Sequence, residues 1–172
     1  GDDAAQWHDG SLLALDTVVE GVHFDPGTDL GDVANKAIAA CVSDLCAMGG
    51  EADAVLVSAQ LPPGCDGRAL AEGLRAAARR HGVVLAGGDT VATRPGALAL
   101  AVTARGTCHG KVWTRSGGQP GDQLVVSGPL GGSRAGRHLR PNPRRDLVAQ
   151  LRADRVDVHA CMDLSDGLAR AL

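Results

Sequence analysis

The sequence predicts a mixed α/β or α+β protein, and three observations lead to that prediction. Segments with the length and apolar pattern of strands alternate along the chain with segments that have helical spacing. Hydrophobic residues make up 44% of the 172 residues, which is enough to bury a core. Aromatic residues make up only 2%, so the core must be built from Ala, Val and Leu. Such small side chains suit close packing of helices on a sheet.

The first strand and the first helix are predicted in the N-terminal third. Residues 12–24 read LLALDTVVEGVHF, and an apolar run of this kind is typical of a buried strand. Residues 30–48 have helical spacing, with Asp29 as the N-terminal cap and Gly49 as the C-terminal stop. Asp44 lies beside the apolar stripe of this helix, so we expect its side chain at the edge of the core.

A second helix and two further strands are predicted next. Residues 52–61 form the expected second strand, and residues 67–80 form a helix capped by Asp66. Residues 83–86 are predicted as a short buried strand, followed directly by the sequence Gly-Gly-Asp-Thr. Residues 98–104 alternate between apolar and less apolar side chains, which indicates a strand with one buried face.

The C-terminal part is predicted to be less regular. Its expected elements are a loop at 113–122, a strand at 124–127, a short helix near 133–139, a helix at 147–152, a strand at 159–163, and a helix capped by Ser165. We therefore divide the chain into an N-terminal domain, residues 1–127, and a linker with the beginning of a C-terminal domain, residues 128–172. Because the chain opens without Met and stops inside a predicted helix, we expect a fragment or truncated relative of a longer protein.

Charge and cysteine content exclude several classes of protein. A net charge of −3 gives no electrostatic basis for binding nucleic acid. No apolar run approaches the length of a membrane span. The five cysteines form no CxxC pair and show no zinc spacing, and their odd number fits a protein of the reducing cytoplasm.

Several carboxylates lie where a charge needs a partner. Asp16 and Asp89 each follow an apolar strand, Asp44 lies beside an apolar helical stripe, and Asp163 ends a short predicted strand. A half-desolvated carboxylate is costly when nothing compensates its charge. If the strands before Asp16 and Asp89 are neighbours, their carboxylates converge, and clustered carboxylates raise one another's pKa unless a cation lies between them. Mg²⁺ shared with the phosphates of a nucleotide is the partner that this pattern predicts.

Most of the candidates also have a simpler interpretation, although none explains Asp163. Asp89 after two glycines is common turn chemistry, Asp44 is consistent with an ion pair, and Asp2 with Asp3 is consistent with a polar terminus. Arg115 could clamp a phosphate but is more often a solvated loop charge, and His23 could hydrogen-bond a substrate but is more often a core-edge histidine. A helix cap with a dipole-matched acid explains Ser165 and Asp166. From the residues alone, the sequence predicts a Mg²⁺-dependent enzyme that acts on phosphates.

Six short motifs follow one another along the chain. They are Gly1-Asp2-Asp3-Ala4-Ala5, Asp16 with Val19-Glu20-Gly21-Val22-His23-Phe24, Ser43-Asp44-Leu45 with Ala47-Met48-Gly49, Gly87-Gly88-Asp89-Thr90, Arg115-Ser116-Gly117 with Pro120-Gly121-Asp122, and Asp163-Leu164-Ser165-Asp166-Gly167-Leu168. In this order the chain resembles, over its whole length, the thiamine-monophosphate kinase family of the aminoimidazole-ribonucleotide-synthetase-like superfamily. The resemblance implies an α+β fold, with a mixed sheet that has helices on one face and the start of a second α+β domain.

The resemblance also implies a reaction and a set of site residues. The implied reaction is ATP-dependent phosphorylation of thiamine monophosphate to thiamine diphosphate, by direct in-line transfer with Mg²⁺. The implied assembly is a homodimer in which residues 1–127 bind ATP and Mg²⁺ and form the dimer contact. The implied metal ligands are Asp2, Asp16, Asp44, Asp89, Asp163 and Asp166. The implied ATP contacts are Gly88, Asp89, Arg115 and Ser165, and the implied contact with thiamine phosphate is His23.

A few positions depart from the family pattern. Ala14 and Leu15 stand before Asp16, where the family has hydroxyl residues, so we expect one metal site to be weaker. Ala71 stands where the family commonly has an aromatic residue near the adenine, and Cys41 replaces a usual Asn. Two other readings therefore stay open. One is a non-catalytic relative that binds nucleotide or serves as a dimerisation module, and the other is a superfamily member that activates another substrate oxygen with ATP.

Overall fold

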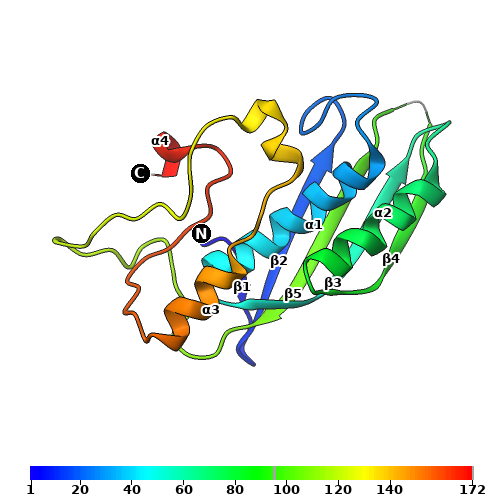
Figure 1. The fold of residues 1–172 in the computed structure, drawn as a ribbon. Coiled ribbons are helices and arrows are strands. Elements are labelled where there is room, and N and C mark those ends of the chain that lie inside the picture. The colour runs from blue at the N-terminus through cyan, green and yellow to red at the C-terminus, as the bar shows by residue number, and fades with distance from the viewer. Residues whose placement is uncertain (95, 172) are drawn as a thin grey trace.

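The computed structural model describes residues 1–94 and 96–171 and contains one mixed sheet with helices on one face. Two helices, α1 and α2, cover one side of the five-stranded sheet, whose strand order is β1-β2-β5-β3-β4 (Figure 1). The predicted α+β class is confirmed. The elements are β1 (Ala5–Gln6), β2 (Ser11–Val19), α1 (Leu30–Ala47), β3 (Glu51–Leu61), α2 (Gly67–Arg80), β4 (Val84–Ala92), β5 (Ala99–Thr107), η1 (Ser133–Ala135), η2 (Arg137–Leu139), α3 (Arg145–Ala153) and α4 (Leu168–Ala171).

The sheet is assembled mostly from antiparallel neighbours. Strand β5 pairs antiparallel with β2 on one side and with β3 on the other. Strands β3 and β4 pair in parallel, and α2 makes the crossover between them. Because β5 is central, its inward positions are fully covered: Leu100, Val102 and Ala104 are 0% exposed. The alternation predicted for this segment is therefore confirmed.

The core lies between α1 and the covered face of the sheet. The side chains of Leu12, Ile38, Leu45 and Val55 are almost completely buried there and pack into one cluster with the inward residues of β5. The core contains a single Phe, Phe24, and one Trp, Trp113. Small aliphatic side chains therefore build the core, as the composition predicted.

The two long helices begin where their capping residues predicted. Asp29 Oδ1 accepts hydrogen bonds from the backbone N–H groups of Gly31 and Asp32, and Asp66 Oδ1 accepts from those of Arg68 and Ala69. Helix α2 has the predicted bounds, and α1 ends one residue earlier than predicted. Local capping chemistry is enough to fix these boundaries because it satisfies N–H groups that have no intrahelical partner.

Two strand predictions in this part of the chain were wrong in extent. Strand β2 ends at Val19, because Gly21 takes a left-handed conformation and its N–H bonds Phe24 O, which folds residues 20–24 into a turn. Strand β4 does not stop before the Gly-Gly-Asp-Thr sequence but runs through it to Ala92. Gly88 allows this close pairing, since a Cβ atom there would clash with the backbone oxygen of Val57. Nor is β4 buried, because it is an edge strand with one face open.

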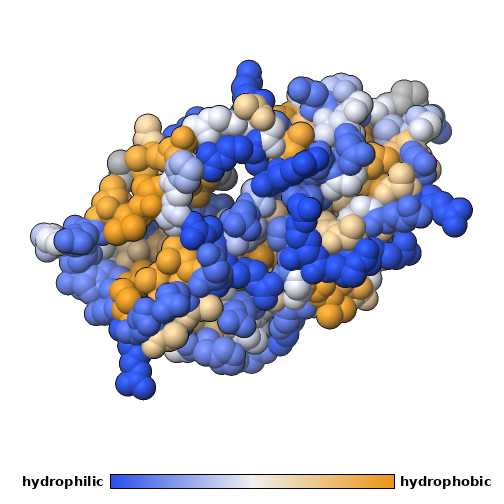
Figure 2. All heavy atoms as spheres, viewed as in Figure 1, coloured by the Kyte–Doolittle hydropathy of each residue, from blue (hydrophilic) through white to orange (hydrophobic). Residues whose placement is uncertain are grey.

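The C-terminal segment, residues 108–171, is less regular than predicted. Residues 124–127 form no strand, and Leu124 and Val125 are 70% and 78% exposed. The segment predicted as a strand at 159–163 makes only a single bridge, between Ala160 and Thr114. Figure 2 shows apolar residues gathered on this segment around α4, whereas hydrophilic residues predominate over α1 and α2. Strands of this kind need a partner edge, and the described part of the chain supplies none for residues 124–127.

Two helical predictions in the segment hold in part. The helix predicted near 133–139 consists of the two short 3-10 helices η1 and η2. The helix predicted at 147–152 is α3, which is slightly longer. Helix α4 begins only at Leu168, so Ser165 and Asp166 precede it and lie outside its first turn. The predicted cap at Ser165 is therefore not formed.

One arginine of this segment contacts the end of α1. Arg152 of α3 donates hydrogen bonds to Gly49 O and Lys111 O, and its guanidinium lies 4.5 Å from the ring centre of Trp113. The bond to Gly49 holds the C-terminal segment against the end of α1, and the other two contacts lie within the segment. The domain boundary at residue 127 remains a prediction. Among the described residues, no helix is both long and apolar enough to cross a membrane.

Candidate metal and phosphate site

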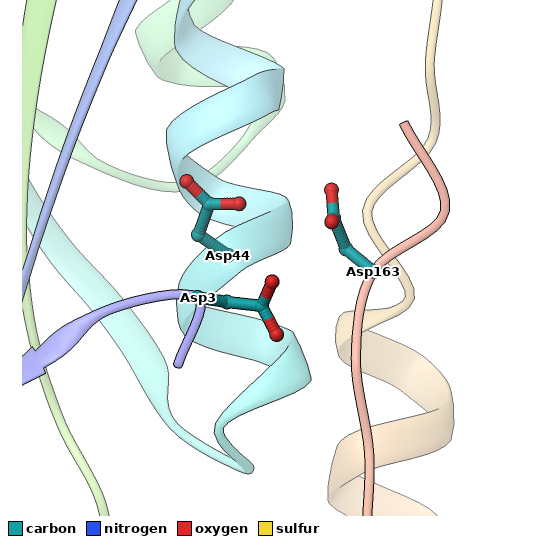
Figure 3. Close-up of side chains that lie close together, drawn as sticks. All are labelled: Asp3, Asp44 and Asp163. Carbon is teal, nitrogen blue, oxygen red and sulfur yellow. The ribbon is translucent and has the colours of Figure 1, made fainter. Parts of the chain in front are cut away.

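Three carboxylates from distant parts of the chain meet beside α1. Asp3 comes from the N-terminal segment, Asp44 from α1 and Asp163 from the C-terminal segment, and their side chains point toward one another (Figure 3). One carboxylate oxygen of each lies within 4.8 Å of those of the other two. Asp44 and Asp163, two of the implied metal ligands, therefore lie side by side in the structure.

The helix brings Asp44 to this position through its pattern of burial. Most of α1 beyond its first turn is buried, and the half-buried positions there are Lys36, Ala40, Ser43 and Asp44. Their spacing puts them on one stripe of the helix. We call these four residues the α1 stripe. Asp44, at one end of the stripe, belongs to the cluster, and Ser43 hydrogen-bonds Asp163.

Asp3, rather than Asp2, belongs to the cluster. The side chain of Asp3 is 1% exposed, and its Oδ1 accepts hydrogen bonds from the guanidinium of Arg115. Its Oδ2 is buried and has no hydrogen-bond partner among the described residues. Asp2 is exposed and accepts instead from the backbone N–H of Arg115, at 2.9 Å. The sequence shows two adjacent acids at this point, but nothing in the local sequence distinguishes the acid that points inward from the one that points outward.

The cluster holds protons that isolated carboxyl groups would lose. Burial, with the charges of Asp163, Asp16 and Asp3, raises the pKa of Asp44 to about 8. Burial and the charge of Asp3 raise the pKa of Asp163 to about 6, whereas Arg115 opposes that shift. Three close carboxylates, with a buried oxygen that lacks a partner, form a donor set that fits a hard divalent cation such as Mg²⁺.

Asp16 lies on the same side of the sheet as this cluster. It pairs with Val102, which is buried beneath α1, and paired residues in an antiparallel ladder project to the same face. Burial raises the pKa of Asp16, and the charges of His23 and Lys36 lower it. His23 is exposed in the turn after β2, and its Nδ1 accepts a hydrogen bond of 3.0 Å from the backbone N–H of Val19.

Asp89 and Gly88 lie elsewhere, on the open face of the sheet. Asp89 pairs with the exposed Ser58, whereas the neighbours of Ser58 in β3 point toward the helices. Strands β2 and β4 are separated by β5 and β3, so the condition for convergence of Asp16 with Asp89 is not met within one chain. Gly88 and Asp89 instead line a shallow hollow of about 420 Å³, together with Leu15 and Leu56.

Ser165 and Asp166 do not join the acid cluster. Both are exposed, and Asp166 accepts a hydrogen bond of 3.2 Å from Arg170, one helical turn further on. Arg115 is the one predicted nucleotide contact that lies beside the cluster, through its hydrogen bonds to Asp3. Lys36 was not among the candidate residues at all, although it precedes Asp44 by two turns on the α1 stripe.

The structure shows where three of the residues that depart from the family pattern lie. Ala14 is 4% exposed and packs under α1, whereas Leu15 is 67% exposed on the open face. Only Ala14 therefore shares a sheet face with Asp16. Cys41 is buried and its thiol donates to Val102 O, at 2.9 Å, so it serves the contact between α1 and β5.

One family model matches much of this chain, and two known proteins that resemble it in sequence share one name. The model of the family described as AIR synthase related protein, N-terminal domain, matches residues 1–108. A thiamine-monophosphate kinase of Rhodopirellula baltica is 40% identical over 163 residues, which are 92% of this chain and 50% of that protein. The Escherichia coli protein of the same name is 35% identical over 180 residues, 91% of this chain and 54% of that protein. The chain thus spans about half the length of these relatives.

Solved structures show the same likeness. A crystal structure of thiamine monophosphate kinase from Aquifex aeolicus has a TM-score of 0.85 at 30% identity and covers 96% of this chain and 63% of its own. A structure described as AaThiL complexed with AMPPCP and TMP has a TM-score of 0.86 at 30% identity, with coverages of 98% and 61%.

Proposed function

The chain belongs to the AIR synthase related protein family, whose N-terminal domain it contains over residues 1–108, and from this premise we propose that the protein is a kinase. It transfers the γ-phosphoryl group of ATP to thiamine monophosphate and forms thiamine diphosphate. The observation that carries the proposal is the meeting of Asp3, Asp44 and Asp163 beside Arg115. The names of the relatives, and the neighbour complexed with AMPPCP and TMP, support this choice of substrates.

Mg²⁺ is the metal that we assign to the site. Asp3, Asp44 and Asp163 would hold it, with Asp16 nearby on the same face of the sheet. When bound, it would neutralise negative charge on the phosphates and so favour their approach to the acceptor. The sequence assigned Asp2 to this role, and we now propose Asp3 in its place, because Asp3 is the acid whose side chain lies in the cluster.

We propose a direct in-line transfer. A phosphate oxygen of thiamine monophosphate attacks the γ-phosphorus of ATP, the bond from that phosphorus to the β–γ bridging oxygen breaks, and ADP leaves with the electron pair. A phosphate monoester has a second pKa of about 6, so it is largely a dianion at neutral pH and needs no general base. The tasks left to the chain are positioning and charge compensation. Arg115 supplies a guanidinium beside the acid cluster, and His23 presents its Nε2 to solvent near Asp16 because Val19 occupies Nδ1.

We propose that two copies of the chain pair through the open face of the sheet. Large apolar side chains are exposed there: Leu15 at 67%, Leu56 at 51%, Val84 at 64% and Val91 at 43%. Contiguous exposed apolar surface on a sheet is costly in water and marks an interaction site. A second copy offers the same surface, so a twofold pairing would cover both faces at once.

This pairing also gives Gly88 and Asp89 a role. They lie on the open face beside Leu15 and Leu56. The acid cluster of their own chain is on the other face, and two strands separate β4 from β2, which carries Asp16. We propose that they approach the nucleotide bound by the partner copy, so that each site takes residues from both chains. Ser165 and Asp166 keep their assignment to ATP and metal as proposals, since both precede α4 only a few residues after Asp163.

We propose a cytoplasmic location because the cysteines are free thiols. All five cysteines are free, among them Cys65, Cys108 and Cys161, which are only partly buried. Free thiols persist in a reducing compartment.

The experiment that tests the function is an assay with the intact protein, ATP, Mg²⁺ and thiamine monophosphate, with separation of thiamine diphosphate from the substrates. Formation of thiamine diphosphate and ADP in equal amounts supports the proposal. Tight binding of ATP without turnover of thiamine monophosphate would favour the non-catalytic relative, and ATP consumption with another acceptor would favour a different member of the superfamily.

A further inference from the structure

Lys36 lies on the same half-buried stripe of α1 as Asp44 and has no role in the function described so far. It belongs to the α1 stripe with Ala40, Ser43 and Asp44, and it is half-buried like them. About two helical turns, roughly 12 Å along the axis, separate it from Asp44. The stripe therefore has an acidic end, where the three carboxylates meet, and a basic end at Lys36.

The hydrogen bonds of Lys36 leave most of its donors free. Its Nζ donates to the backbone oxygen of His138, at 3.0 Å. Within residues 1–94 and 96–171, no carboxylate lies close enough to form an ion pair with it, whereas Arg140 and Arg115 each have one. An ammonium group has three N–H donors, and a half-buried one loses hydration without full compensation. The position therefore calls for an anionic partner.

The charges around Lys36 indicate the kind of anion. Asp16 is the acid that raises the pKa of Lys36, and burial is the larger effect that lowers it. The charges of His23 and Lys36 both lower the pKa of Asp16. Lys36 thus acts on a carboxylate that lies on the same side of the sheet as the acid cluster. An ammonium in such a position is suited to an oxyanion that also contacts the metal, which is the chemistry of a phosphate.

We propose that the Lys36 ammonium binds a phosphate oxygen of a substrate in this site, at the end of the α1 stripe opposite Asp44. The identity of the substrates rests on the proposed function, whereas the class of ligand, a phosphate, does not. The phosphate belongs either to the nucleotide or to the phosphate monoester that accepts the transferred group, and the two are separated by kinetics below.

A purely structural role for Lys36 makes a different prediction. Three side chains of α1 hold the segment around η2: Asp32 pairs with Arg140, Asn35 donates to Leu139 O, and Lys36 donates to His138 O. If Lys36 served only this docking, loss of the exposed Arg140 pair would have the same effect as loss of Lys36. Arg140→Ala is therefore the matched control, because it weakens the same contact without removing the ammonium.

The test measures binding of inorganic tripolyphosphate to the intact protein by calorimetry in the presence of Mg²⁺. We expect Lys36→Met to weaken the affinity about 10- to 100-fold, the range for loss of one charged hydrogen bond. Lys36→Arg should retain most of the affinity, and Arg140→Ala should bind like the parent protein. Thermal denaturation of each variant reports whether it folds, and Lys36→Gln replaces Lys36→Met if the latter does not.

Steady-state kinetics then identifies the phosphate. A rise in KM for thiamine monophosphate alone assigns Lys36 to the acceptor, and a rise for ATP alone assigns it to the nucleotide. Unchanged tripolyphosphate affinity in Lys36→Met, an equal loss in Arg140→Ala, or no binding by the parent protein overturns the inference. Loss of tripolyphosphate binding in Lys36→Met, together with a parent protein that forms no thiamine diphosphate, would uphold the lysine and reject the proposed reaction.

Discussion

Carboxylate oxygens of Asp44 and Asp163 lie within 4.8 Å of each other, although one residue belongs to α1 and the other to the C-terminal segment. Burial is the main reason that the pKa of each is raised, to about 8 for Asp44 and about 6 for Asp163. Protons therefore compete with a metal cation for the oxygen atoms of both groups. Binding of a divalent ion should release protons, and its affinity should rise with pH across this range.

The first prediction concerns stability without metal. The pKa of Asp44 is about 8 in the folded protein and near 3.8 in an unfolded chain. Between these values the folded state holds a proton that the unfolded state has lost, so the stabilisation from Asp44 is fully present below about pH 4 and is lost as pH rises through about 8. Urea unfolding at a series of pH values, with a chelator present, measures this fall.

Comparison with Asp44→Asn isolates the contribution of Asp44. The variant cannot titrate at this position, so its free energy of unfolding should fall less steeply with rising pH than that of the parent protein. Asp163 remains in both proteins and contributes equally over its own, narrower range, up to about pH 6. Identical slopes for the two proteins would mean that Asp44 is not protonated at neutral pH.

The second prediction separates two neighbouring acids. Asp3→Asn should lower the affinity for Mg²⁺ by at least about tenfold, since even the loss of an outer-shell partner has effects of that size. Asp2→Asn should leave the affinity nearly unchanged, because Asp2 is exposed and accepts only from the backbone of Arg115. Calorimetric titration of both variants with Mg²⁺ makes the comparison, and a larger loss in Asp2→Asn would restore the original assignment of Asp2.

The third prediction concerns the sharing of a site between two copies. Asp44→Asn and Asp89→Asn should each reduce kcat about 10²-fold or more, as expected when electrostatic stabilisation of the transferred group is lost. Unfolding and refolding a mixture of the two inactive variants should then restore activity. Half of the dimers would contain one of each chain, and one of their two sites would have both aspartates, so about a quarter of the parent activity should return.

The mixing experiment has a clear contrary outcome. If Asp89 acted within its own chain, every site in the mixture would lack one aspartate and no activity would return. The same refolding treatment applied to each variant alone is the control, and it should give no recovery.

The fourth prediction concerns the open face of the sheet. Leu56→Glu puts a charge at the centre of the proposed contact, beside the hollow that Leu15 also lines. Sedimentation analysis should show a dimer for the parent protein and a monomer for this variant, because burying an unpaired charge is strongly unfavourable. Val156→Glu is the matched control, since Val156 is 49% exposed but lies in the C-terminal segment. A dimer that survives Leu56→Glu would place the contact elsewhere.

Local chemistry made the helices predictable. The caps Asp29 and Asp66 mark the starts of α1 and α2, and the glycines after these helices mark their ends. The same locality explains the failures. The sequence around Gly88 has the composition of a turn, yet it pairs with β3 over its whole length, because the partner strand decides whether such a segment is extended. Leu124 and Val125 have strand composition but no partner edge among the described residues.

The sequence by itself determined the class of fold, the family, and the set of acids from which a metal site is drawn. Only the tertiary structure decided which acids meet. Asp3 rather than Asp2 turns inward, and Asp89 lies on the opposite face of the sheet from Asp16. The physical reason is that the face to which a strand residue projects depends on its register, and its neighbours depend on strand order. Both properties are set by contacts between residues far apart in the chain.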